Sequence, residues 1–149
     1  MNTSQTRRRA RGFSLIELLI VVAIIGIVAA IAVPNYVESQ HAACAASAVE
    51  SLRAIHSSEV SYRAANNRFA DLGTLGSDNF INDGHVVAGA KSRYRFALTV
   101  DAADPDADYR ATATPSLIPG RWRHFYIDAS GVIRSSMGAP ASASSQPRD

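Results

Sequence analysis

Glu17 makes the clearest chemical demand in this sequence, because it is a carboxylic acid placed at the edge of an apolar stretch. From Leu18 to Val33 every residue is apolar or glycine. A carboxylate inside a membrane helix costs up to about 3 kcal/mol on insertion scales, so an acid in this place indicates a function and needs a partner. The chemistry predicted for Glu17 is therefore ion pairing with a cation in apolar surroundings.

Four aspartates at short intervals form a second group of chemically capable side chains. Carboxylate oxygens at such spacing can bind Ca²⁺, although the spacing of an EF-hand loop is absent. The alternative interpretation is a solvated turn between two strands. The four residues of this weak candidate calcium site are Asp101, Asp104, Asp106 and Asp108.

Arg121, Trp122 and Arg123 begin a segment that mixes cationic and aromatic side chains as far as Tyr126. Such a surface can bind single-stranded nucleic acid or another anionic polymer. The alternative is a half-exposed edge strand. The formal charge of the whole chain is +2, but most of the excess comes from arginines near the N-terminus. Without residues 1–12, eleven basic and thirteen acidic residues remain, so we do not expect a nucleic-acid partner.

No catalytic or cofactor-binding motif is recognisable in the sequence. The four histidines lack metal-ligand spacing such as H-E-x-x-H, and there is no glycine-rich phosphate loop, nucleophile elbow or pair of catalytic carboxylates. Cys44 is the single cysteine, which excludes an intramolecular disulfide. Its alanine neighbours favour close helix packing over a reactive thiol. We therefore expect neither enzymatic activity nor a cofactor.

The element that positions Glu17 is a helix long enough to span a bilayer, since about 18 apolar residues suffice. Four arginines precede it, at positions 7, 8, 9 and 11. Positive charge on this side predicts that the N-terminal end stays in the cytoplasm and that the rest of the chain is exported. We place the transmembrane segment at about residues 13–35.

The stretch Gly12-Phe13-Ser14-Leu15-Ile16-Glu17, followed by the apolar helix and Pro34, resembles the N-terminal signature of type IV pilins and type II secretion pseudopilins. The resemblance covers Arg11 to about Tyr36. It implies cleavage between Gly12 and Phe13 by a prepilin peptidase, N-methylation of Phe13, and assembly into a helical filament. It also implies that Glu17 meets the Phe13 amine of a neighbouring subunit.

An ordinary secretory signal peptide is the competing interpretation of the same N-terminal segment. Ala30-Ile31-Ala32 offers a small-x-small cleavage site, so a secreted chain would start at Val33. Glu17 argues against it, because the hydrophobic part of a signal peptide has no use for an acid.

The helix is predicted to continue from Phe13 to about Ala65. Pro34 predicts a kink or local melting, and Gly26 indicates either close helix packing or, with Pro34, a segment that unwinds in a filament. After Pro34 a stripe recurs at three- and four-residue steps, which predicts packing against a sheet. The stripe consists of Ala45, Ala48, Val49, Leu52, Ile55, Glu59 and Tyr62.

The remaining chain predicts a loop at 66–92, an antiparallel sheet at 93–135 and a disordered Ser- and Ala-rich tail at 136–149. Alternating residues predict strands near 94–100, 109–114 and 122–128 and a short returning strand at 132–134. The expected fold is α+β: a long N-terminal helix, membrane-spanning in its first half, packed on a small β-meander, as in pilins.

We therefore predict a structural subunit of a type IV pilus or a pilus-like secretion pseudopilus. The resemblance implies a homo-oligomeric filament, a prepilin peptidase, an assembly ATPase and an inner-membrane platform as partners. The precursor would lie in the inner membrane, and the product in an extracellular pilus or a periplasmic pseudopilus. The alternative function is a signal-anchored or secreted periplasmic binding domain with Trp122 to Tyr126 as its contact surface.

Overall fold

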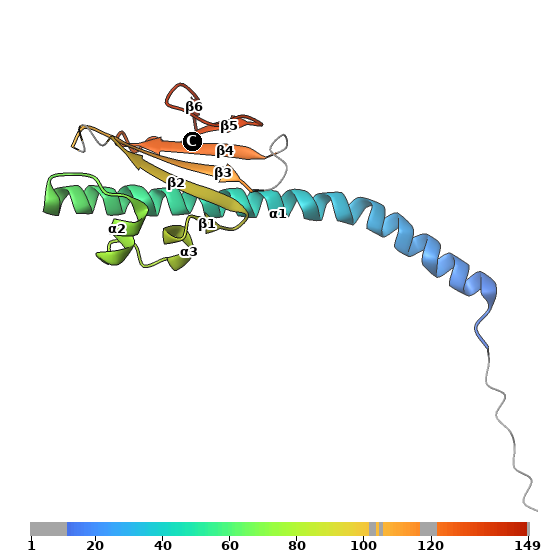
Figure 1. Ribbon diagram of the computed structural model, residues 1–149. Helices are drawn as coiled ribbons and strands as arrows, with labels where there is room; N and C mark the ends of the chain where they lie inside the picture. Colours follow the sequence, from blue (N-terminus) through green and yellow to red (C-terminus); the bar gives the residue numbers. More distant parts are fainter. Residues whose placement is uncertain (1–11, 102–103, 105, 117–121, 149) are drawn as a thin grey trace, which may run out of the picture. The chain divides into compact units, whose positions relative to one another are not determined.

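The structure of this chain is a computed structural model that describes residues 12–101, 104, 106–116 and 122–148 (Figure 1). The chain divides into two compact units, residues 1–39 and 40–149. The helix α1 (Leu15–Asn66) contributes to both units. Residues 1–11, which make up nearly all of the predicted leader, lie outside the described part.

The first unit consists, among the described residues, of the start of α1. The helix is continuous through Gly26 and Pro34. One interpretation of Pro34 predicted that the helix melts locally there, and the single chain does not show this. A proline removes one backbone hydrogen bond from a helix interior, and α1 continues across that loss.

In the second unit, the predicted stripe on α1 packs against the sheet. Leu52 and Ile55 are fully buried, and they share one hydrophobic core with Ala111 and Phe125 of the sheet. Every position of the stripe is buried or half-buried. The α+β class with a long helix on an antiparallel sheet is therefore confirmed. Apolar residues three and four apart share one helix face, which is why the periodicity was sufficient.

The connection between α1 and the sheet contains two short helices, α2 (Leu72–Ser77) and α3 (Gly84–Val87). The Asp71 side chain accepts a hydrogen bond from Thr74 N at the start of α2. Asp83 does the same at α3, and its carboxylate also pairs with Lys91 Nζ at 2.7 Å. The connection predicted as a loop at 66–92 thus contains two short helices, and an aspartate caps the start of each one.

The sheet has six strands in sequential antiparallel order: β1 (Ala90–Lys91), β2 (Tyr94–Val100), β3 (Tyr109–Pro115), β4 (Arg123–Asp128), β5 (Arg134–Met137) and β6 (Gln146–Pro147). In β2 and β3 the buried residues alternate with more exposed ones, as predicted. Figure 1 shows the longer strands lying along the second half of α1, with α2 and α3 toward its other side.

The short returning strand was predicted at 132–134, which is too early in the chain. Residues 132 and 133 belong to the turn, and β5 begins at Arg134 and pairs with β4. Gly131 adopts a φ of 74°, and Ile133 is buried although it lies outside a strand. An apolar residue in a turn mimics a strand position, which explains the shift.

The C-terminal segment is not the disordered tail that its composition predicted. β6 pairs with β5, and Arg148 N donates to the Ile133 carbonyl at 2.8 Å. The Arg148 guanidinium lies 5.1 Å above the centre of the Phe125 ring, and Ala141 is buried. Pairing at a sheet edge uses main-chain groups, so composition alone cannot reveal it.

Candidate assembly site

The first half of α1 is an apolar surface that nothing in its own unit covers. Large apolar side chains from Phe13 to Val37 are between 43 and 79% exposed. The best 18-residue window has a mean hydropathy of 3.0, and none of that window is buried. By length and composition this helix is able to cross a membrane. An apolar surface of this size requires lipid or other protein chains around it.

Glu17 lies in the first turn of α1, one turn beyond Phe13. The helix begins after Ser14, whose carbonyl accepts hydrogen bonds from Glu17 N at 3.1 Å and Leu18 N at 3.2 Å. The Glu17 side chain is exposed and makes no hydrogen bond or ion pair within the described residues. A negative charge near a helix N-terminus is favourable, which makes this turn tolerant of the acid. The carboxylate is therefore free to pair with another chain.

The four candidate calcium ligands do not gather into a site. Within the described part of the chain, no three acidic, histidine or cysteine side chains are placed to hold a metal ion. One of the four, Asp108, instead accepts hydrogen bonds from Tyr109 N at 2.8 Å and Ala129 N at 3.1 Å. Its carboxylate ties the β2–β3 turn to the β4–β5 turn, which is a structural role. The calcium prediction therefore loses its geometric basis.

The predicted surface of arginines and aromatic rings is not a stacking platform. Arg121 lies outside the described residues. The Trp122 ring is only 6% exposed and lies 4.2 Å from the His41 ring, measured between centroids. Arg123 is exposed, and its guanidinium donates to Ser135 Oγ at 3.3 Å. β4 is an interior strand between β3 and β5, so the edge-strand alternative is wrong as well.

A buried acid, Glu59, was missed as a chemically special residue. It occupies one position of the apolar stripe and is completely buried. Its Oε2 accepts a hydrogen bond from Ala70 N at 3.1 Å, whereas Oε1 has no hydrogen-bond partner in the described structure. Burial raises the pKa of Glu59 to about 7, opposed by the Ala70 hydrogen bond and reinforced by the charge of Asp71. A charged residue in the stripe was the available sequence signal.

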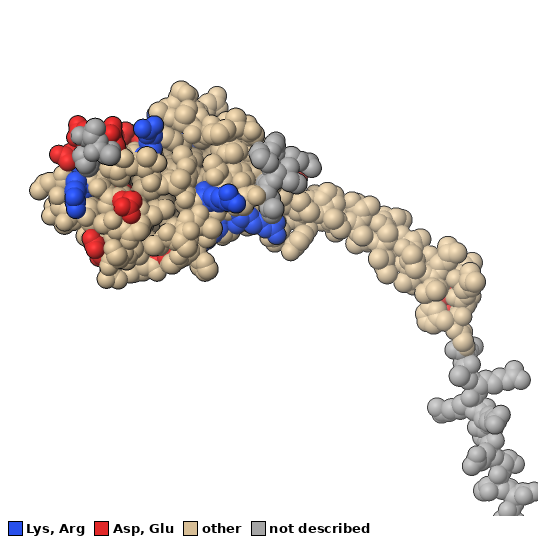
Figure 2. All heavy atoms as spheres, in the orientation of Figure 1, with Lys and Arg blue, Asp and Glu red and all other residues tan. Residues whose placement is uncertain are grey.

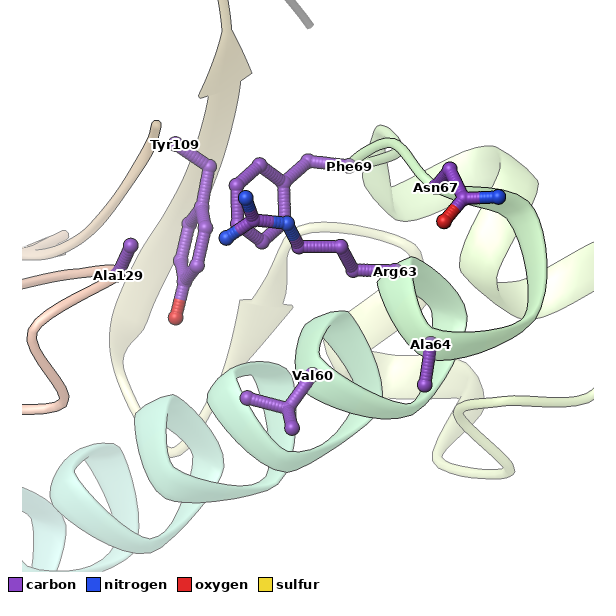
Figure 3. A pocket seen from close by; sticks show the side chains of 7 residues that line it. All are labelled: Val60, Arg63, Ala64, Asn67, Phe69, Tyr109 and Ala129. Atoms are coloured by element: carbon purple, nitrogen blue, oxygen red, sulfur yellow. The ribbon is translucent and has the colours of Figure 1, made fainter. Parts of the chain in front are cut away.

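A surface pocket of about 360 Å³ lies near the end of α1 (Figure 3). Phe69 and Tyr109 form its aromatic wall, with their ring centroids 4.9 Å apart. The Arg63 guanidinium lies 4.8 Å from the centre of the Phe69 ring. The exposed Val60 completes the α1 side of the pocket, together with Ala64. The Tyr109 hydroxyl shares a hydrogen bond with His56 Nδ1, and the stacked arginine is explained by a cation–π contact.

An exposed apolar helix with one acid in its first turn, followed by a small α+β unit, is the pattern of a membrane-anchored subunit. Comparison with known proteins agrees with this class. The family model described as the prokaryotic N-terminal methylation motif matches residues 7–33. This stretch contains the predicted cleavage point and Glu17.

Curated relatives extend the similarity beyond the motif. The type IV major pilin protein PilA of Myxococcus xanthus is 36% identical over 104 residues, covering 70% of this chain and 44% of PilA. The type II secretion system core protein G of Dickeya chrysanthemi is 36% identical over 62 residues, or 42% of this chain and 40% of that protein. The protein of the same name from Aeromonas hydrophila is 35% identical over 63 residues, with 42% and 44% coverage.

The resemblance to type IV pilins and type II secretion pseudopilins is thereby confirmed. This chain spans less than half the length of these relatives. No solved structure matches it.

Proposed function

We propose that this chain is a structural, non-catalytic subunit of a type IV pilus or a pilus-like secretion pseudopilus. The observation that carries the proposal is the uncovered apolar helix with Glu17 as the one acid in its first turns. Such a helix first lies in the inner membrane and then packs against copies of itself. Apolar packing supplies the affinity, and the acid supplies the register.

Processing creates the partner for Glu17. Cleavage between Gly12 and Phe13 by a prepilin peptidase leaves an α-amine on Phe13, which is then N-methylated and remains cationic. When helices stack with an axial offset, the carboxylate of Glu17 reaches the amine of the neighbouring subunit. Pairing relieves two charges in an apolar environment at once, whereas either charge alone is costly there.

Gly26 and Pro34 mark the segment of α1 that we propose to unwind or stretch in the filament. Gly26 has open space around its Cα, and Pro34 leaves one carbonyl without its usual helical donor. Neighbouring helices or side chains would satisfy the carbonyls that are released. An assembly ATPase and an inner-membrane platform would drive the transfer from the membrane into an extracellular pilus or a periplasmic pseudopilus.

The alternative function, a secreted or anchored periplasmic binding domain, is not favoured. Its contact surface depended on an accessible Trp122, and that ring is covered by His41 and Tyr94. The single-tryptophan head thus offers no aromatic platform on the described part of β4.

Two measurements test the proposal. Mass spectrometry of the mature protein should give a chain that starts at a methylated Phe13, whereas a start at Val33 would indicate ordinary secretion. Glu17→Ala should still be inserted and processed but should yield at least about tenfold less filament, because the neighbouring amine loses its countercharge. Glu38→Ala, an exposed acid further along α1, is the matched control and should assemble normally. Normal filament yield from Glu17→Ala would refute the register role.

A further inference from the structure

Arg93 and Arg95 form a pair of free cations at one end of the sheet. Both side chains are exposed and make no ion pair or hydrogen bond within the described residues. Their backbone is held firmly, since Ser116 N donates to the Arg93 carbonyl at 2.8 Å and the Ser92 hydroxyl contacts that of Ser47 at 2.8 Å. The turn thus presents its arginines at a fixed place.

The same turn is conformationally strained. Ser92 and Arg93 have φ angles of 49° and 65°, where a two-residue hairpin normally has Asn-Gly. A bulky charged residue in this region is uncommon and is retained only where the surroundings enforce it. The turn thus holds the backbone of Arg93 in one fixed conformation.

Asp104 and Asp106 form the opposite charge at the other end of the sheet. Both are exposed, and their carboxylates make no ion pair or hydrogen bond within the described residues. The register places Tyr94 opposite Pro115 and Val100 opposite Tyr109. The arginines before and within β2 are therefore separated from the aspartates by the length of this strand, about 20 Å at 3.3 Å per residue.

Figure 2 shows acidic atoms gathered at one end of the head, with two groups of basic atoms beside them, and further basic atoms toward the other end. A separation of about 20 Å exceeds the Debye length of about 8 Å at physiological salt, so the two ends cannot neutralise one another within one chain. Complementary charges at opposite ends of one molecule are satisfied when copies stack head to tail. Contacts of this kind are heterologous and generate open filaments instead of closed dimers.

We propose that the arginine end of one copy, Arg93 and Arg95, docks the acidic turn of a second copy through Asp104 and Asp106. This inference rests on the proposed function, because a shared filament axis would align the heads in one direction. The contact fixes the axial order of the heads, in addition to the contact made by Glu17 on the anchoring helix. Guanidinium–carboxylate pairs suit the task, since their planar geometry adds orientation to charge attraction.

The test reverses each end of the full-length chain and measures filament yield in cells that carry the assembly machinery. Arg93→Asp with Arg95→Asp should lower the yield at least about tenfold, because like charges would then face each other. Asp104→Arg with Asp106→Arg should do the same. The chain that carries all four substitutions should regain the wild-type yield. Coexpression of the arginine-reversed chain with the aspartate-reversed chain should also restore it.

A matched control keeps the charge change but moves it elsewhere. Arg53→Asp alters an exposed arginine of α1 outside the proposed contact and should leave filament yield within about twofold of wild type. Processing before Phe13 and the urea-unfolding midpoint of each variant show whether the chain still folds.

The possible outcomes are distinct. Unchanged filament yield in the arginine-reversed chain overturns the inference while leaving the proposed function standing. Loss in the arginine-reversed chain, with normal yield in the aspartate-reversed one, also overturns it and assigns the arginines to anionic lipid. Absence of filaments from the wild-type chain contradicts the proposed function, and this inference with it. Mutual rescue of the two reversed ends supports the head-to-tail contact.

Discussion

Glu59 makes the stability of the head depend on pH in a direction opposite to that of ordinary carboxylates. Its pKa is raised from 4.5 to about 7, chiefly because the carboxyl is buried. Below about pH 4.5 the Glu59 carboxyl is protonated in both the folded and the unfolded chain, so folding has no cost of burying a charged group. Between about pH 4.5 and pH 7 the unfolded chain has released the proton that the folded chain still retains, so stability falls across this window and the loss is complete once the pH passes 7.

The size of the effect follows from the shift. A difference of about 2.5 pH units, at about 1.36 kcal/mol per unit, sets an upper limit of about 3.4 kcal/mol. Part of this change falls below pH 5, which leaves about 2 kcal/mol between pH 5 and pH 8. The Glu59→Gln variant has no carboxyl to titrate at this site. Between pH 5 and pH 8 the free energy of unfolding of the wild-type protein should therefore decrease by about 2 kcal/mol more than that of the variant.

The assay is urea unfolding of the full-length protein in detergent, followed by fluorescence of the single tryptophan, Trp122, which is buried in the head. The comparison of slopes with pH is independent of any constant cost of placing an amide at this site. Glu50→Gln is the control, since Glu50 is exposed and paired with Arg53 at 2.6 Å. If Glu59→Gln retains the wild-type pH slope between pH 5 and 8, the reasoning about its burial is wrong.

One further substitution and one truncation test the turn at residue 131 and the C-terminal segment. Gly131→Ala should destabilise the head by about 1–2 kcal/mol, because the residue has a φ of 74° and an added Cβ would lie 3.0 Å from His56 Nε2. Gly84→Ala, where nothing lies within 4 Å, should be close to neutral in the same urea titration. Truncation after Ser145 removes β6 and the bond to the Ile133 carbonyl, and should cost about 1–2 kcal/mol. An unchanged unfolding midpoint in the truncated chain would show that the C-terminal segment does not stabilise the head.

Much of the fold could be predicted because its signals are local. Alternation along Tyr94 to Val100 identified a strand with one buried face, and the helical stripe identified the face of α1 that meets it. The candidate assembly site could be proposed from the sequence alone, because Glu17 and its apolar surroundings lie within one short segment, and the role of Glu17 stays a prediction. These properties depend on neighbours in sequence, which periodicity reports directly.

The errors concern residues whose environment is set by distant parts of the chain. Trp122 looked like an exposed platform until His41 of α1 covered its ring. In the sequence Glu59 is an ordinary member of a helix face. In the structure its carboxyl is buried and accepts a hydrogen bond from the backbone of residue 70. The C-terminal segment looked unstructured until the open edge of β5 provided main-chain partners.

The sequence by itself determined the apolar first half of α1, the acid at its start and the class of fold, because each of these follows from the positions of apolar side chains and the period at which they recur. The tertiary structure alone decided what the head buries: the aromatic ring of Trp122 and the carboxyl of Glu59. The physical reason is that burial is a property of packed neighbours, and those neighbours become adjacent only when the chain folds.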